Sequence, residues 1–386
     1  MKIAFVVLLV VHGLIHAMGF AKAFGLAELA ALKVPIGRGM GLVWLGAALA
    51  LLATAVMVAT SRPTFWVPAI VALVASQLAI VTSWSDAKFG TLPNVVLLAP
   101  VALALLDLRP GSFRSTYHAE IADRLNRPTS DEPSLLTEGD LASLPPLVAT
   151  YVRRTGAVGL PRVRDVAVTW EGTMVLDPKK PNETLKTIAV QHNFHGAETA
   201  RIFFMEGAKA GIPFQGLHRY VGEHARFQVR VAQLFDVVDG RGPEMDQSET
   251  VTLFNDVCLL APALLPFVDV SWEPEDGRSI RARFTNAGHT IHATLRFDAS
   301  GDLVDFVSED RFQSPDGKTF VKYPWSTPMH EYTTFAGRRA PSRGEAIWHE
   351  PRGPLVYARL RIVDIAWNVS TKGAAARPPS KPGGGA

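Results

Sequence analysis

The pattern of apolar and polar positions changes about one third of the way along the chain. Up to about Leu108, long apolar runs are interrupted by few charged residues, whereas short runs of alternating apolar and polar residues follow between Arg162 and Val369. A helix needs about 20 mostly apolar residues to cross the hydrocarbon core of a bilayer, and alternation is typical of strands with one buried face. The sequence therefore predicts an N-terminal all-α transmembrane bundle and a C-terminal β-rich domain.

Four apolar segments are predicted to be transmembrane helices, residues 3–21, 41–60, 65–84 and 92–108. The first follows Lys2 and ends at Ala21-Lys22-Ala23, which also resembles the cleavage site of a signal peptide. Two histidines inside its apolar run favour a retained helix. Basic residues flank the four segments on both sides, so the side of the membrane that holds the C-terminal domain stays undecided.

The polar stretch between the two patterned regions is rich in proline, serine and charged residues. It is predicted to be a linker that contains one short helix, from Tyr117 to Leu125, and a further helix is expected from Pro145 to Thr155. The final residues are dominated by glycine, proline and alanine, a composition that predicts disorder. The predicted organisation is a membrane domain, a linker, a β-rich domain and a disordered tail, at residues 1–108, 109–144, 145–370 and 371–386.

The β-rich region contains about eleven short alternating runs and one long interruption, residues 245–266. Leu253, Val257 and Leu260 recur in this interruption at helical spacing, so it is predicted to be a helix that covers the sheet. Ser248 or Thr250 is the expected N-cap. The predicted fold is α+β, a strongly curved antiparallel sheet or half-barrel whose concave face is either filled by side chains or left as a ligand cavity.

His12 and His16 lie one turn apart in the first predicted transmembrane helix and therefore share one face. Such a pair can bind a metal ion if a third ligand is supplied. Because the first and third helices run in the same direction, the loop that carries Asp86 is predicted to reach the same membrane face. Two alternatives stay open, hydrogen bonding to neighbouring helices and a proton-linked role.

Charge and composition exclude several classes of protein. The net charge is +3 and the isoelectric point is near 9.0, but the basic residues form no cluster, which excludes a nucleic-acid-binding protein. The single cysteine, Cys258, excludes an intrachain disulfide framework and a cysteine-based zinc site. The sequence has neither a nucleophile elbow nor a glycine-rich phosphate loop after a strand, so it gives no positive support for a hydrolase, kinase or dehydrogenase.

Two sets of residues in the β-rich domain are candidates for ligand binding. Asp310 and Arg311 follow a predicted strand, where the arginine would bind an anionic head group or the two would form an internal salt bridge. Trp272, Trp325 and Trp348 would line a lipid cavity or fill a hydrophobic core.

The stretch from Asn255 to Phe312, with the later motifs YPWSTPMHEY and EAIWHE, resembles an uncharacterised family of bacterial membrane proteins, a domain of unknown function. The motifs HGLIHAMGF and WSDAKFGTLPN resemble the membrane part of some members. The β-rich domain is also similar in architecture to the half-barrels of periplasmic lipoprotein carriers, which hold acyl chains against a concave face. The resemblance implies a multi-pass protein of the bacterial inner membrane, but no activity.

We therefore expect a non-enzymatic, membrane-anchored binding protein for a lipid-like or other apolar ligand. The first alternative is a membrane-bound metal- or redox-dependent enzyme that uses the pair of His12 and His16. The second alternative is a scaffold or assembly protein. The expected partners are the membrane and a lipid or apolar small molecule, nucleic acid is not expected, and the sequence leaves protein partners undetermined.

Overall fold

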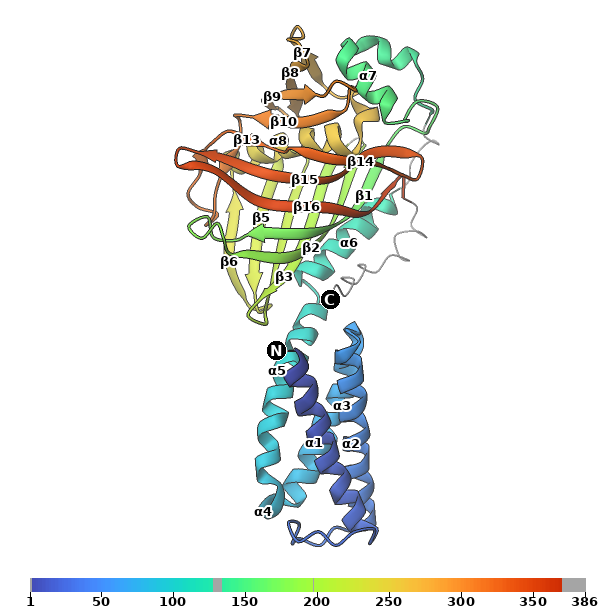
Figure 1. Cartoon of the computed structure of the whole chain (residues 1–386), viewed down its shortest axis with the longest axis vertical. Coiled ribbons are helices and arrows are strands. Elements are labelled where there is room, and N and C mark those ends of the chain that lie inside the picture. Colours follow the sequence, from blue (N-terminus) through green and yellow to red (C-terminus); the bar gives the residue numbers. More distant parts are fainter. Residues whose placement is uncertain (1, 128–133, 197, 370–386) are drawn as a thin grey trace. The chain divides into compact units, whose positions relative to one another are not determined.

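The computed structural model describes residues 2–127, 134–196 and 198–369. The chain divides into two compact units, Met1–Ser112 and Phe113–Ala386. The first unit is helical, and the second is built mainly of strands (Figure 1). The predicted fold class is confirmed, since the helical region is followed by a large, curled antiparallel sheet that forms a half-barrel. The predicted disordered tail, 371–386, lies outside the described residues.

The first unit contains four long helices that are apolar enough to cross a membrane by length and composition. Short helical turns precede α3 and link it to α5. The helices and turns are α1 (Lys2–Ala23), α2 (Arg38–Ala59), η1 (Pro63–Phe65), α3 (Trp66–Thr82), α4 (Trp84–Ala87), η2 (Lys88–Gly90) and α5 (Thr91–Leu108).

Small residues allow the helices of the first unit to approach each other closely. Gly19 of α1 lies against Trp44 of α2, and a Cβ atom at this glycine would come within 2.1 Å of the indole ring. Ala47 and Ala48 of α2, like Ala72 of α3, are fully buried between the helices. Small residues at helix contacts are the usual solution where association depends on close packing rather than on the hydrophobic effect.

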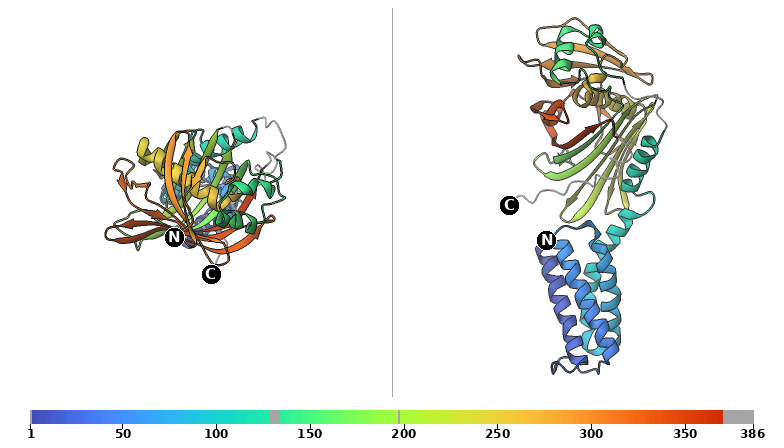
Figure 2. Two further views of the ribbon diagram at one scale, coloured as in Figure 1. Left: turned by 90° about the horizontal axis from the view of Figure 1, so that it is seen from above. Right: turned by 90° about the vertical axis from the view of Figure 1, so that its right-hand side faces the viewer.

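Among the described residues of the second unit, fourteen strands form one sheet in which the neighbouring strands pair antiparallel. The first and last strands of the domain sequence, β1 and β16, pair in the middle of the sheet. The order is β6-β5-β4-β3-β2-β1-β16-β15-β13-β10-β9-β8-β7, with β14 added beside β15. Figures 1 and 2 show the curl of this sheet.

The strands on the N-terminal side of the helix α8 are β1 (Asp165–Val175), β2 (Thr184–His195), β3 (Thr199–Lys209), β4 (Ile212–Val221), β5 (His224–Val231) and β6 (Phe235–Arg241). Those on its C-terminal side are β7 (Val270–Trp272), β8 (Ser279–Asn286), β9 (His289–Phe297), β10 (Leu303–Ser308), β13 (Trp325–Ser326), β14 (Met329–Phe335), β15 (Arg338–Glu350) and β16 (Gly353–Trp367). A separate two-stranded sheet joins β11 (Phe312–Gln313) to β12 (Val321–Lys322). The remaining helical elements of the unit are α6 (Phe113–Leu125), η3 (Gly139–Ser143), α7 (Pro146–Arg154), α8 (Pro243–Leu260) and η4 (Pro262–Leu264).

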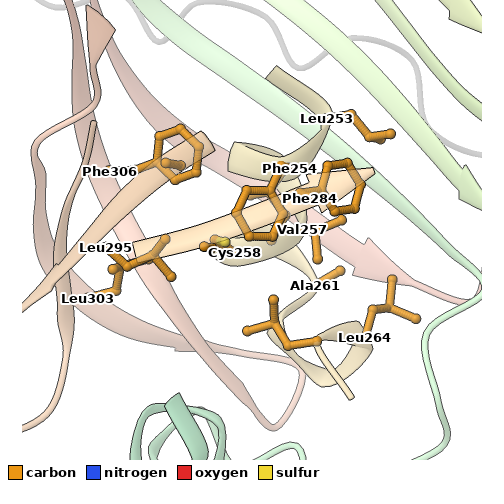
Figure 3. Close-up of a cluster of buried hydrophobic side chains, with 14 of the residues drawn as sticks. Leu253, Phe254, Val257, Cys258, Ala261, Leu264, Phe284, Leu295, Leu303 and Phe306 are labelled. Atoms are coloured by element: carbon orange, nitrogen blue, oxygen red, sulfur yellow. The ribbon is translucent and has the colours of Figure 1, made fainter. Parts of the chain in front are cut away.

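Helix α8 packs on the sheet, as the helical spacing of its leucines predicts. Its contacts join strands from both ends of the sheet, including β5 and β9. Phe254 stacks on Phe284 with ring centroids 4.6 Å apart, and the cluster around them includes Phe306 (Figure 3). Cys258 lies in the same cluster, and burial raises the pKa of its thiol well above the usual value.

The predicted N-cap of this helix is wrong. The helix begins at Pro243, and the residue before it is Gly242 rather than Ser248 or Thr250. The hydroxyl of Ser248 donates to the carbonyl of Glu244 at 2.7 Å, and Thr250 makes the equivalent bond within the helix. A serine or threonine can bond either to a free N–H group at a helix start or to a carbonyl four residues earlier, so the residue type alone does not locate the cap.

Helix α6, which lies within the segment predicted to be a linker, is grouped with the second unit. Its apolar residues Phe113, Tyr117 and Ile121 are spaced four apart, form one stripe and pack against a cluster that contains Phe204 and Leu217. Farther along the predicted linker, Leu136 and Leu141 are buried in the main core of the unit. In the described part of this segment, these apolar residues are therefore packed, while polar neighbours such as His118 face outwards.

We predict that Ile121→Ala destabilises the second unit by about 2–4 kcal/mol, because it removes most of a buried side chain from the contact between α6 and the sheet. Ala119→Ser, on the exposed face of the same helix, is the matched control and should have little effect. Unfolding of the full chain in detergent, followed by the circular dichroism of the sheet, measures both. Equal stability of the two variants would show that α6 is only loosely attached.

Candidate functional site

The second unit contains a cavity of about 560 Å³ on the concave side of the curled sheet. Ligand sites for small molecules usually fall between about 300 and 1,000 Å³. The lining is mostly apolar and comes from both halves of the sheet, with Met205 and Phe214 on one side and Trp348 and Leu355 on the other. Residues of α8 and the segment after β10 complete the wall.

Strand register explains why these side chains share one surface. Residues paired across antiparallel strands lie on the same face. Phe203 of β3 pairs with His218 of β4, which pairs with Phe227 of β5, and all three line the cavity. Two residues after Phe203 on β3, Met205 pairs with Gly216 of β4. A Cβ atom at Gly216 would lie 2.5 Å from the end of the Met205 side chain. The glycine therefore leaves room for the methionine side chain.

The apolar surface continues to one end of the sheet. Phe235 pairs with Val231, a lining residue, yet its own side chain is 65% exposed. Ile212 lies two residues before Phe214 on the same face and is 53% exposed. The concave face is therefore apolar towards the hairpin ends of β4, β5 and β6.

Another part of the lining is a cluster of charged and polar side chains that come from β3, β4, α8 and the segment after β10. Arg201 on β3 places Nε 2.7 Å from Oδ2 of Asp256 and Nη1 3.3 Å from Oε2 of Glu249, and both carboxylates belong to α8. Oε1 of Glu249 lies 3.1 Å from Nε2 of His218 and 3.6 Å from Nη2 of Arg311. The two arginines balance the two carboxylates in formal charge.

Burial and these neighbours act in opposite directions on the titration of Glu249. Burial by itself would raise the pKa of this carboxyl, but the adjacent His218 and the guanidinium groups of Arg201 and Arg311 lower it to about 2. Burial lowers the pKa of His218 despite the nearby carboxylate, and the two arginines add to that effect. Near neutral pH the cluster therefore holds an ionised glutamate and an uncharged imidazole.

Arg311 is held between aromatic rings. Its guanidinium carbon lies 4.2 Å from the ring centroid of Trp325 and 5.1 Å from that of Trp348. Nη1 donates to the hydroxyl of Tyr357 at 3.1 Å, and the indole N–H of Trp325 donates to the same hydroxyl at 3.2 Å. Stacking on indole rings stabilises the cation and fixes the plane of its five N–H groups.

The structure brings together three of the five ligand-binding residues predicted in the β-rich domain. Arg311, Trp325 and Trp348 meet in the cavity wall. Asp310 lies elsewhere, where it accepts from the backbone N–H of His292 at 2.8 Å and from Lys322 Nζ at 2.9 Å. Successive residues of an extended chain point to opposite sides, which separates Asp310 from Arg311 and leaves the expected salt bridge between them unformed.

Trp272 is likewise absent from the described residues that line the cavity, and it packs against the main hydrophobic core. Sequence reasoning did not identify Arg201 or Glu249. For Arg201 a signal was present, since it falls on the same strand face as Phe203 and Met205, where a charged residue needs a buried partner. The partner could not be identified because it comes from a distant helix.

The predicted metal ligands of the first unit are not assembled. His12 Nε2 lies 3.1 Å from Oδ1 of Asn94, and His16 Nδ1 lies 2.9 Å from the carbonyl of His12. Asp86 accepts from the backbone N–H groups of Lys33 and Val34, and so joins the loop after α3 to the loop after α1. Within residues 2–127, 134–196 and 198–369, no three His, Cys, Asp or Glu side chains are arranged to hold a metal ion.

The fold and the cavity together define a half-barrel protein with a helical N-terminal region. Residues 134–360 match a family of unknown function, DUF6544, over more than half of the chain, and the chain belongs to this family. The match confirms the predicted membership of an uncharacterised family.

One solved structure that is similar to the chain is a beta-barrel-like protein of a domain of unknown function, DUF1849, from Brucella abortus. The identity is 13%, the match covers 54% of this chain and 99% of that chain, and the TM-score is 0.22. No curated protein matches the chain.

The ionisation of Glu249 makes the free energy of unfolding depend on pH in a way that can be tested. Its folded-state pKa of about 2 lies below the usual value of 4.5, so the ionised carboxylate stabilises the fold above pH 4.5 and this contribution is lost as the pH falls towards 2. The loss is about 3 kcal/mol, because one pKa unit corresponds to about 1.4 kcal/mol. Glu249→Gln should therefore show a flatter decline of the unfolding free energy between pH 5 and pH 3, in chemical unfolding of the full chain.

The control for this measurement is Glu223→Gln, which changes an exposed glutamate of the same unit and should retain the wild-type acid response. A Glu249→Gln variant whose stability falls with acid as steeply as the wild type would contradict the assignment.

Proposed function

We propose that this protein is a membrane-anchored binding protein that holds a lipid-like or other apolar small molecule in the cavity of its half-barrel. The observation that carries the proposal is the open, mainly apolar volume of about 560 Å³ beside an otherwise well-filled core. Protein interiors are normally packed as densely as organic crystals, so a volume of this size requires an explanation other than stability.

Burial of an alkyl chain against the apolar lining can account for binding of a lipid-like ligand. Each methylene group removed from water contributes about 0.8 kcal/mol. A chain of about ten methylene groups therefore contributes on the order of 8 kcal/mol, which corresponds to a dissociation constant near the micromolar range before the costs of binding are subtracted. The apolar surface around Phe214 and Val231 offers the contacts for such a chain.

The first unit supports the membrane part of the proposal. Its four helices are long and apolar enough to span a bilayer, and many of their large apolar side chains face outwards, such as Leu49, Val74 and Val95. Exposed apolar surface of this extent is stable in lipid and unstable in water. We place the protein in the inner membrane of a bacterium as a multi-pass protein, where apolar ligands are concentrated.

The test is mass spectrometry of organic extracts from the purified full-length chain. Wild-type protein should yield an apolar or amphiphilic compound in a fixed molar ratio. Val229→Trp, which places an indole into the cavity opposite Gly216, should remove that compound. The matched control is Lys186→Trp, an equally large substitution at an exposed position of β2, which should retain it.

Lipid that merely surrounds the helices is present equally in all three proteins, so only the difference between the variants is informative. The same extract from Val229→Trp, Lys186→Trp and wild type would exclude ligand binding in the cavity.

A further inference from the structure

Some arginines of the second unit bind both oxygens of one carboxylate through Nε and Nη2. Arg154 donates from Nε and Nη2 to the two oxygens of Asp302, at 2.9 and 3.2 Å. Arg226 makes the same pair of bonds to its aspartate, Asp239, at 2.7 Å each. This bidentate contact along the Nε and Nη2 edge is the strong mode of recognition between a guanidinium and a planar acid.

Arg311 has the same edge but no carboxylate on it. Nη2 lies 3.6 Å from Glu249, beyond the range of a hydrogen bond. Nε is buried and has no acceptor among the described residues. The indole rings of Trp325 and Trp348 cover the guanidinium, and the hydroxyl of Tyr357 accepts a hydrogen bond from Nη1. A buried ionic donor without an acceptor is costly, and an acid brought by a ligand would remove that cost.

The acidic side chains beside the cavity are already engaged by other groups. Oδ2 of Asp256 accepts from Arg201 at 2.7 Å, from Gln191 at 2.6 Å and from Asn193 at 3.0 Å. Glu249 accepts from Arg201 and also from Thr252, at 3.1 Å. Arg201 therefore makes hydrogen bonds to both carboxylates, whereas Arg311 adds a longer ion pair to Glu249, at 3.6 Å, and its Nε keeps no acceptor among the described residues.

Along β4 and β5 the lining changes from His218, in the charged cluster, to Phe214 and Val231 near the hairpin ends. Arg311 and His218 lie with the charged cluster against α8, whereas the concave face becomes apolar along β4 and β5 towards Phe235. A molecule with one polar end and one long apolar end matches this polarity. A purely apolar ligand would leave Nε of Arg311 without an acceptor.

On these grounds we infer that the ligand is an amphiphile with an acidic head group, a carboxylate or a phosphate, and that Arg311 binds this group through its Nε and Nη2 edge. The inference rests on the proposed function, since it requires a ligand in the cavity. The apolar tail lies along the lining of β3 to β5. The head group contacts the stacked guanidinium beside Trp325 and Trp348.

The experiment is native mass spectrometry of the full-length chain in detergent with added single-chain compounds of equal length. The compounds are dodecanoate, dodecyl phosphate and dodecanol, with acetate and inorganic phosphate as head groups without a tail. Wild-type protein should bind at least one of the two acidic amphiphiles on the order of tenfold more tightly than the alcohol, as expected for a charge-assisted bidentate bond. Neither acetate nor inorganic phosphate should bind comparably.

The variant that tests the residue is Arg311→Gln, which should abolish the preference, so that the acids bind no more tightly than dodecanol. Retained dodecanol binding also shows that the variant is folded. Arg311→Lys keeps the charge without the planar edge and should retain only part of the preference. Arg296→Gln, at an exposed arginine on β9, is the matched control and should behave as wild type.

The outcomes distinguish a failure of the acidic head group from a failure of the cavity as a ligand site. Equal affinity of wild-type protein for the acids and the alcohol overturns the acidic head group and leaves the apolar ligand site in place. Binding of inorganic phosphate or acetate as tightly as the amphiphiles also overturns it, because the ligand would then be a free anion. Failure of every chained compound to bind overturns the proposed function together with this inference.

Discussion

The buried ion network between α8 and β3 is the interaction on which the rest of the second unit depends. Asp256 and Glu249 both bind Arg201, while Phe254 of the same helix packs against Phe284 in the core. A buried charge that loses its partner costs several kcal/mol, so the helix and the strand are stable only in the register that pairs these groups. This network therefore fixes the place of α8 on the concave face.

The position of α8 divides the concave face into a filled part and an open part. Helix α8 contacts β5 and pairs with charged residues of β3 and β4, and the parts of β3 to β5 beyond these contacts form a wall of the cavity. The helices of the first unit are packed in a different way. They pack through small residues and a few polar contacts, such as that of His12 with Asn94, and direct their large apolar side chains outwards.

Residue pattern predicted much of the fold and part of the site. The helical spacing around Val257 located α8, because packing on a sheet leaves a periodic trace in the sequence. The cap at Ser248 was wrong, since a hydroxyl has two kinds of backbone partner. The helix predicted around Tyr117 is present as α6, and its stripe of three apolar residues packs against a buried cluster. In the site, residue type pointed to Arg311 but wrongly grouped Asp310 with it.

By itself, the sequence determined the type and order of the main elements through the spacing of apolar residues. Long apolar helices come first, alternating strands follow, and one helix lies among the strands. Only the tertiary structure decided which charges meet. Arg201 and Asp256 are 55 residues apart, on a strand and a helix, and nothing in their neighbouring residues specifies the pairing. Periodicity arises from each residue's position relative to its own element, whereas a cavity and its charges arise from register and curvature, which depend on contacts between distant parts of the chain.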